Sequence, residues 1–124
     1  MAIIPTTKTF TETVHDYISK INPEKLADMG DIQTTGEHIA KLAQFLTRTN
    51  QELSSRQWAY NLKVKFCYEG LEKKSVALAK MGAESSTEWK DLRDCVALKE
   101  SILEMLKSLK YLQRSLGDEY KHTQ

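Results

Sequence analysis

The sequence has few residues that interrupt helices and few that bind metals. Its 124 residues include only five glycines and two prolines, so long helices can run uninterrupted. The two cysteines, Cys67 and Cys95, match no zinc or redox spacing and fall on the apolar sides of expected helices. We expect free, buried thiols, with a disulfide as the alternative. The three histidines lie far apart, which predicts no metal site.

Long apolar runs and catalytic motifs are also missing. The longest apolar runs span only a few residues, and the N-terminus lacks the basic and apolar regions of a secretory signal. We therefore expect no membrane contact and a cytoplasmic location. No glycine-rich phosphate loop and no nucleophile elbow is present, and acidic pairs such as Asp91 with Asp94 have basic neighbours. The sequence predicts a protein that is not an enzyme, with no cofactor and no small-molecule substrate.

What the sequence does contain is a heptad of apolar residues near its C-terminus. Its members alternate at spacings of three and four residues, as they do along one side of an α-helix. Such a seam has to be covered by another helix, so we expect it to form a core or an oligomer interface. The seam consists of Cys95, Leu98, Ile102, Met105, Leu109, Leu112 and Leu116.

Local signals predict where the helices begin and end. In a capping box, a hydroxyl residue precedes a glutamate by three positions, and each caps a backbone amide of the first turn. Short helices are expected within residues 10–29, the second of them starting at Asn22-Pro23 and ending at Gly30. The three capping boxes are Thr9 with Glu12, Thr34 with Glu37, and Ser85 with Glu88.

Two long helices account for most of the chain. Apolar residues recur near the helical period over 36–81, where the stripe ends with Leu78, and over 86–120. A short turn formed by Gly82 and Ser85–Ser86 joins the two helices and makes them antiparallel. A bend at Gly70 or a break near Ser54–Ser55 is compatible with the pattern. The predicted fold is all-α: one domain over 1–124 with a long helical hairpin. It would form a bundle of more than one copy, since a helix of about 70 Å exceeds one small globule.

The middle of the chain is basic and aromatic, although the net charge of the whole chain is only +1. Residues 56–80 hold six basic and two acidic side chains, whereas residues 1–40 hold three basic and six acidic ones. Single-stranded nucleic acid is commonly bound by such a segment, with cations along the phosphates and aromatic rings on the bases. The candidate nucleic-acid-binding residues are Arg56, Tyr60, Lys63, Lys65, Phe66, Tyr68, Lys73 and Lys74.

A purely structural explanation of these residues stays open. Tyr60 lies on the apolar stripe of its helix, and Trp58 and Phe66 could line a second packing face while the lysines face solvent. The chain would then be a protein–protein interaction module, such as an assembly, adaptor or inhibitor subunit, without nucleic-acid binding.

Two segments resemble the small recombination mediator proteins of tailed phages. Residues 60–70, YNLKVKFCYEG, are similar to the basic and aromatic segment of that family. Residues 103–114, LEMLKSLKYLQR, are similar to its terminal helix. The order of a long basic helix, a glycine-containing break and a leucine-rich helix also agrees, over residues 36–121.

The resemblance implies an all-α protomer that assembles into rings, binds single-stranded DNA and helps load a recombinase. The expected partners are further copies, single-stranded DNA and a recombinase, in the cytoplasm of a bacterial host if a phage encodes the chain. The seam from Leu98 to Leu116 would belong to the assembly surface. The residues implied to contact phosphates are Lys63, Lys65, Lys73 and Lys74, and those implied to lie near bases are Tyr60, Phe66 or Tyr68.

Overall fold

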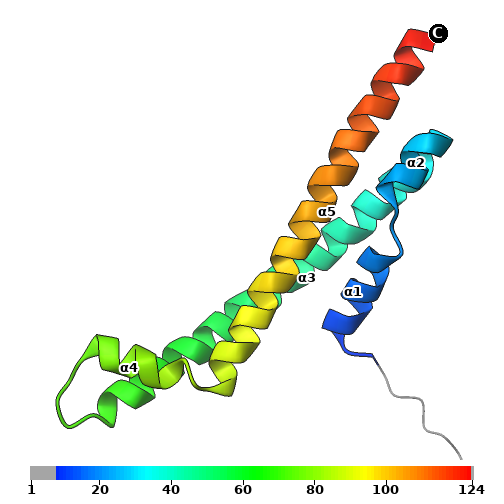
Figure 1. The fold of residues 1–124 in the computed structure, drawn as a ribbon. Coiled ribbons are helices and arrows are strands. Elements are labelled where there is room, and N and C mark those ends of the chain that lie inside the picture. Colours follow the sequence, from blue (N-terminus) through cyan, green and yellow to red (C-terminus); the bar gives the residue numbers. More distant parts are fainter. Residues whose placement is uncertain (1–7, 124) are drawn as a thin grey trace, which may run out of the picture. The chain divides into compact units, whose positions relative to one another are not determined.

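The computed structural model describes residues 8–123, which form five α-helices and no strand. The predicted all-α helical fold is therefore confirmed. The chain divides into two compact units, a terminal unit (residues 1–45 with 102–124) and a central unit (residues 46–101). The helices, shown in Figure 1, are α1 (Phe10–Ser19), α2 (Pro23–Met29), α3 (Ile32–Glu69), α4 (Val76–Ala83) and α5 (Thr87–Thr123). Both α3 and α5 contribute residues to each unit.

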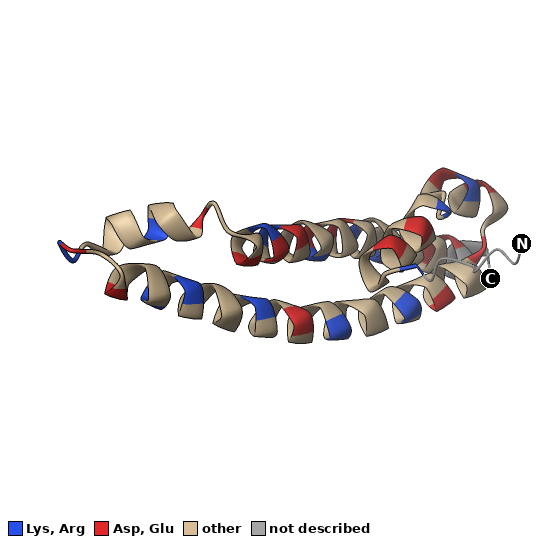
Figure 2. Cartoon of the chain, turned by 90° about the horizontal axis from the view of Figure 1, so that it is seen from below, with Lys and Arg blue, Asp and Glu red and all other residues tan. Residues whose placement is uncertain are grey.

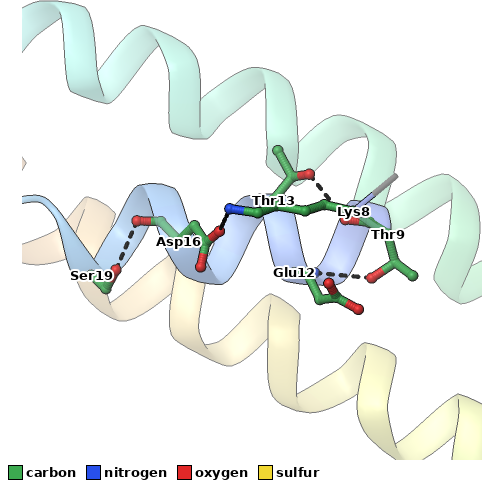
Figure 3. Close-up of polar contacts among 6 residues, drawn as sticks. All are labelled: Lys8, Thr9, Glu12, Thr13, Asp16 and Ser19. Atoms are coloured by element: carbon green, nitrogen blue, oxygen red, sulfur yellow. Dashed lines mark hydrogen bonds and ion pairs between the residues drawn. The ribbon is translucent and has the colours of Figure 1, made fainter. Parts of the chain in front are cut away.

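Side chains near the start of α1 hold its first turns in place (Figure 3). The Thr9 hydroxyl accepts a hydrogen bond from the Glu12 amide at 3.2 Å, as the first capping box predicts. The ammonium group of Lys8 forms an ion pair with the carboxylate of Asp16, two turns further along the helix. This pair lies in solvent, so its contribution to stability is small.

The predicted ends of α2 are also confirmed. The Asn22 side chain accepts a hydrogen bond from the Lys25 amide at 3.2 Å, and Pro23 occupies the first helical position. Gly30 ends the helix with a φ of 60°, a left-handed conformation that a residue with a Cβ atom adopts only at a cost.

The first long helix begins earlier than its capping box predicts. The Asp31 carboxylate accepts a hydrogen bond from the Thr34 amide at 2.9 Å, so Asp31 caps α3 and Thr34 lies within its first turn. This hydrogen bond lowers the pKa of Asp31. An aspartate caps as well as a threonine and carries a charge that favours a helix N-terminus, which explains the earlier start.

The cap of α5 lies one residue after the predicted one. The Ser86 hydroxyl accepts a hydrogen bond from the Trp89 amide at 3.4 Å, whereas the Ser85 hydroxyl donates to the Gly82 carbonyl at 2.8 Å. Gly82 lies inside α4, so the connection between the helices is formed by residues 84–86 rather than by a turn at Gly82.

The prediction of one helix over 36–81 is wrong, because α3 ends at Glu69 and α4 begins at Val76. The Lys74 ammonium donates hydrogen bonds to the carbonyl oxygens of Tyr68 at 3.2 Å and Glu69 at 2.7 Å, which satisfies the open end of α3. The Ser75 hydroxyl accepts from the Leu78 amide at 3.4 Å and caps α4. Lys74 therefore caps the helix before residues 70–75 and Ser75 caps the helix after them, so a break at this place is more favourable than a continuous helix.

Restarting the helix changes which side chains reach the core. The predicted stripe places Leu78 in the interior, but Leu78 is half-exposed and the buried residues of α4 are Ala79 and Ala83. With Gly82, these small residues let α4 lie close to α3; a Cβ atom at Gly82 would stand 3.6 Å from the Cys67 sulfur.

The core of the central unit joins α3, α4 and α5. It is centred on Tyr60, Ala83 and Leu92, with half-buried apolar side chains around them. Thr49 of α3 contacts Cys95 of α5, and Tyr60 of α3 contacts Trp89 of α5. The residue numbers at these contacts therefore increase along α3 while they decrease along α5. Within this unit α3 and α5 are therefore antiparallel, as predicted, and both cysteines are free thiols.

The core of the terminal unit holds α1 against α3 through aromatic rings. Phe45 makes edge-on contacts with Phe10 at 5.9 Å and with Tyr17 at 5.5 Å between ring centroids. The Tyr17 hydroxyl also forms a 2.7 Å hydrogen bond with Nδ1 of His38. The buried apolar residues of this unit are Val14, Ile21, Leu26, Leu42, Ile102, Leu106, Leu109 and Leu116.

The C-terminal heptad packs inside the chain. Four of the six predicted seam positions from residue 98 onward are buried, and the other two are half-buried. Such burial is what a core seam requires, and it leaves little of the seam for contact with another copy. The buried members are Leu98, Ile102, Leu109 and Leu116, and the half-buried ones are Met105 and Leu112.

Replacing Gly82 by alanine is expected to raise the free energy of unfolding by about 0.5–1 kcal/mol. Alanine fits the negative φ of Gly82, and its methyl group would make an ordinary contact with Cys67. Alanine also lowers the conformational entropy of the unfolded chain, so less entropy is lost when the helix forms. The matched control is Gly30→Ala, which forces alanine into a left-handed φ and should lower stability by about 1 kcal/mol. Urea unfolding of both variants measures the two changes in the free energy of unfolding. If both variants were stabilised, or both destabilised, the helical conformation of Gly82 or the left-handed conformation of Gly30 would be contradicted.

Candidate nucleic-acid interface

The eight predicted nucleic-acid-binding residues do not share one surface. All lie in the central unit, on α3 or on the connection to α4, but the helical turn distributes them around α3. One group faces the core, one borders α4, and one points away from the core. Each group therefore has to be considered separately.

The core-facing group is used in packing, which corrects the prediction for Tyr60. This ring is 8% exposed and lies 5.0 Å from the Trp89 ring, so neither of its faces is free for a base. Burial, and to a smaller extent the charge of Glu84, raises the pKa of Tyr60. The guanidinium of Arg56 is also engaged, since it donates to the Asp91 carbonyl at 2.9 Å and pairs with Glu52 at 3.6 Å.

The group beside α4 includes Tyr68, which lines a shallow apolar groove of about 380 Å³ between the C-terminal part of α3 and α4. Tyr68 is half-buried there, and the Lys74 ammonium lies 5.6 Å from its ring centroid while it caps α3. Lys74 is thus a structural cation, whereas Lys73 is exposed on the connection. The groove is lined by Tyr60, Asn61, Val64, Lys65, Tyr68, Val76, Ala79 and Lys80.

The third group belongs to an exposed apolar stripe, here called the outer face: Trp58, Leu62 and Phe66. These residues are four positions apart and lie about 200° around α3 from Tyr60 and Val64, so they point away from the core. Trp58 is 67% exposed and Phe66 is 70% exposed. Of these, the prediction includes only Phe66. Trp58 is absent from the predicted binding residues, although its spacing to Phe66 already pairs the two rings on one possible packing face.

Lysines flank the outer face. The Lys63 ammonium stands 5.2 Å from the Phe66 ring centroid, a cation–π distance, and Lys65 lies on the other side of the stripe, where it also borders the groove. Figure 2 shows further basic positions on this part of α3 and on the connection to α4. Along α3, the acidic residue that follows on this side is Glu69, one turn beyond Phe66. Glu88, at the start of α5, lies within electrostatic reach of Lys63.

The described part of the chain shows neither a cluster of metal ligands nor a membrane-spanning helix. Among residues 8–123, no three histidine, cysteine or acidic side chains come together as metal ligands. None of the helices described there is long and apolar enough to cross a membrane.

Comparison of the chain with models of protein families, with curated proteins and with solved structures found no significant match. The resemblance to recombination mediators thus depends on the two segments quoted above and stays a prediction.

Proposed function

We propose that this protein is a non-enzymatic, single-stranded DNA-binding accessory protein that binds through the outer face of α3. The observation that carries the proposal is the pair of exposed aromatic rings, Trp58 and Phe66, with Lys63 and Lys65 beside them. With Leu62 between them, the two rings form a continuous exposed apolar stripe with polar neighbours, a feature that marks interaction sites on protein surfaces. Stacking rings combined with cations are the usual means of holding a strand without reading its sequence.

The spacing of the two rings favours a single strand over a duplex. Eight residues of α-helix separate Trp58 from Phe66 by about 12 Å. Bases in a duplex follow one another about every 3.4 Å and hide their faces in the stack. Only a single strand can turn separate, unstacked bases toward both rings.

The small net charge of the chain does not oppose this proposal. Residues 56–80 carry a net charge of +4, six basic minus two acidic side chains, and the chain's acidic excess lies within residues 1–40. Phosphate contacts act locally because salt screens charges beyond about 8–10 Å. The binding should therefore be moderate in strength and sensitive to salt.

The test is the binding of a labelled, unstructured DNA oligonucleotide at several salt concentrations. Replacing Lys63 and Lys65 by alanine should weaken binding and make the plot of log affinity against log salt shallower by about 0.7 for each phosphate that is no longer neutralised. Changing Lys20 and Lys25 to alanine alters the net charge equally, on exposed positions outside the central unit, and should leave binding unchanged. No retention of the oligonucleotide at low salt would refute the proposal.

The resemblance extends the proposal to the role of the protein. We propose an oligomeric phage recombination mediator, which binds single-stranded DNA and helps load a recombinase. Since the heptad seam is covered within the chain, the oligomer would have to form through other exposed apolar residues, such as Met29 or Met81. The solution mass, measured with and without an oligonucleotide, reports on this assembly.

The alternative function, a protein interaction module, is favoured by one observation, the apolar groove between α3 and α4. In that alternative the protein does not bind nucleic acid. The groove by itself leaves the rings of the outer face uncovered, since it shares only Lys65 with the outer face and its flanking lysines.

A further inference from the structure

The groove between α3 and α4 exposes apolar side chains that no other part of the central unit covers. At the contact with α3, α4 supplies the small side chains of Ala79 and Ala83, while Val76, at the rim of the groove, stays 58% exposed. The walls from α3 are Val64 and Tyr68, one turn apart, so the groove follows both helices. A trough between two helices is the usual seat for the apolar side of a third helix.

The charged residues that line the groove are basic, and this favours a partner of negative charge. Both charged residues of its lining, Lys65 and Lys80, are cations, one from each wall. The Lys74 ammonium lies near the Tyr68 ring at the end of α3. Among the described residues, acidic ones do not line the groove: Glu84 interacts electrostatically with Tyr60, and Glu69, which follows Tyr68 in the chain, is also outside the lining. A basic segment would be repelled by the rim, and an acidic one would be attracted.

We propose that this groove binds an acidic amphipathic helix of another protein. Its apolar side chains lie on Val64, Tyr68, Val76 and Ala79, and its carboxylates meet Lys65 and Lys80. Because α4 has eight residues and is about 12 Å long, the contact covers about two turns of the partner. Such a small interface gives a weak, reversible interaction.

A fluorescent synthetic peptide tests the proposal. The probe is a helix of about four turns with leucines on one side and glutamates elsewhere, and its twin carries lysines in place of the glutamates. The wild-type protein should bind the acidic peptide, as measured by fluorescence anisotropy, and not the basic twin. Equal binding of the two peptides, or binding of neither, would overturn the proposal.

Two matched variants locate the contact. Val76→Asp places a negative charge in the wall of the groove and should weaken binding of the acidic peptide about tenfold or more. Leu78→Asp makes a similar change on α4 at a half-exposed position that does not line the groove, and should bind like the wild type. Both positions lie in the first turn of α4, where aspartate is tolerated. If both variants bound the acidic peptide equally weakly, the peptide would not be held in the groove, and the proposed site would be wrong.

Two further readouts separate this site from other interactions. Val76→Asp should retain binding of the DNA oligonucleotide, since the outer face is unchanged, so failure of the DNA proposal and failure of this one are distinguishable. The solution mass of the protein alone should also stay the same in Val76→Asp. A mass that rises with concentration in the wild type and not in Val76→Asp would show that a second copy fills the groove, and would overturn the proposed partner.

Discussion

Replacing Leu109 by alanine should lower the free energy of unfolding by about 2–5 kcal/mol. Leu109 is a member of the heptad seam and is fully buried in the terminal unit. The substitution removes apolar surface from the core and leaves a cavity that the surrounding side chains fill only in part. A decrease of this size is a large fraction of the stability of a small protein, and urea or thermal unfolding would show it directly.

The same helix provides the matched control. Leu103 lies six residues earlier on α5 and is 43% exposed, so Leu103→Ala deletes the same atoms from a surface position. It should change the free energy of unfolding by no more than about 0.5 kcal/mol, because leucine and alanine also have similar helix propensities. Similar destabilisation in the two variants would mean that the seam is not the core of a single chain.

The all-α fold could be predicted from the sequence because apolar periodicity is a repeated signal. Seven seam positions at regular spacing leave little choice of helix or of face, and the structure buries or half-buries all of them. The caps of α1 and α2 could be predicted for a similar reason, since Thr9 and Asn22 act on amides within four residues. Local rules suffice where the partner groups are close in sequence.

The break between α3 and α4 depends on competing local signals. Lys74 reaches back to carbonyl groups five and six residues earlier, and Ser75 caps the next helix. A lysine that caps a helix from outside leaves no pattern that distinguishes it from a solvated lysine. The apolar period also continues across the break, through Leu71 and Leu78, so a continuous helix and two shorter ones are equally compatible with it.

The candidate site could be located in the sequence but not resolved into faces. Tyr60 and Trp58 are both aromatic residues in the same basic segment, and only packing shows that one is buried against Trp89 and the other is exposed. A two-residue step on a helix separates opposite sides, so the choice depends on where the neighbouring helices lie. That information comes from contacts of α3 with α4 and α5, which are distant in sequence.

Replacing both Trp58 and Phe66 by alanine should nearly abolish binding of single-stranded DNA. Each stacked ring contributes about 1–3 kcal/mol, so each single variant should bind roughly fivefold to 150-fold more weakly. The fold should remain intact, since both side chains are about two-thirds exposed and neither belongs to the core cluster of the central unit. Filter binding or fluorescence anisotropy with a short oligonucleotide measures the change in affinity, and circular dichroism checks the helix content.

The control for this prediction is Tyr111→Ala. Tyr111 is an exposed aromatic side chain of α5, at 74%, and it lies in the terminal unit, far from the outer face in sequence. Like the rings of the outer face, Tyr111 has cations one turn away, Lys107 and Arg114, so it is a matched aromatic residue on another helix. Its removal should leave affinity unchanged, because the proposed binding surface is on α3. If Tyr111→Ala weakens binding as much as Phe66→Ala does, or if neither ring of the outer face matters, then DNA does not bind along α3. The exposed rings would then be better explained as contacts for another protein, because aromatic side chains also dominate the centres of protein interfaces.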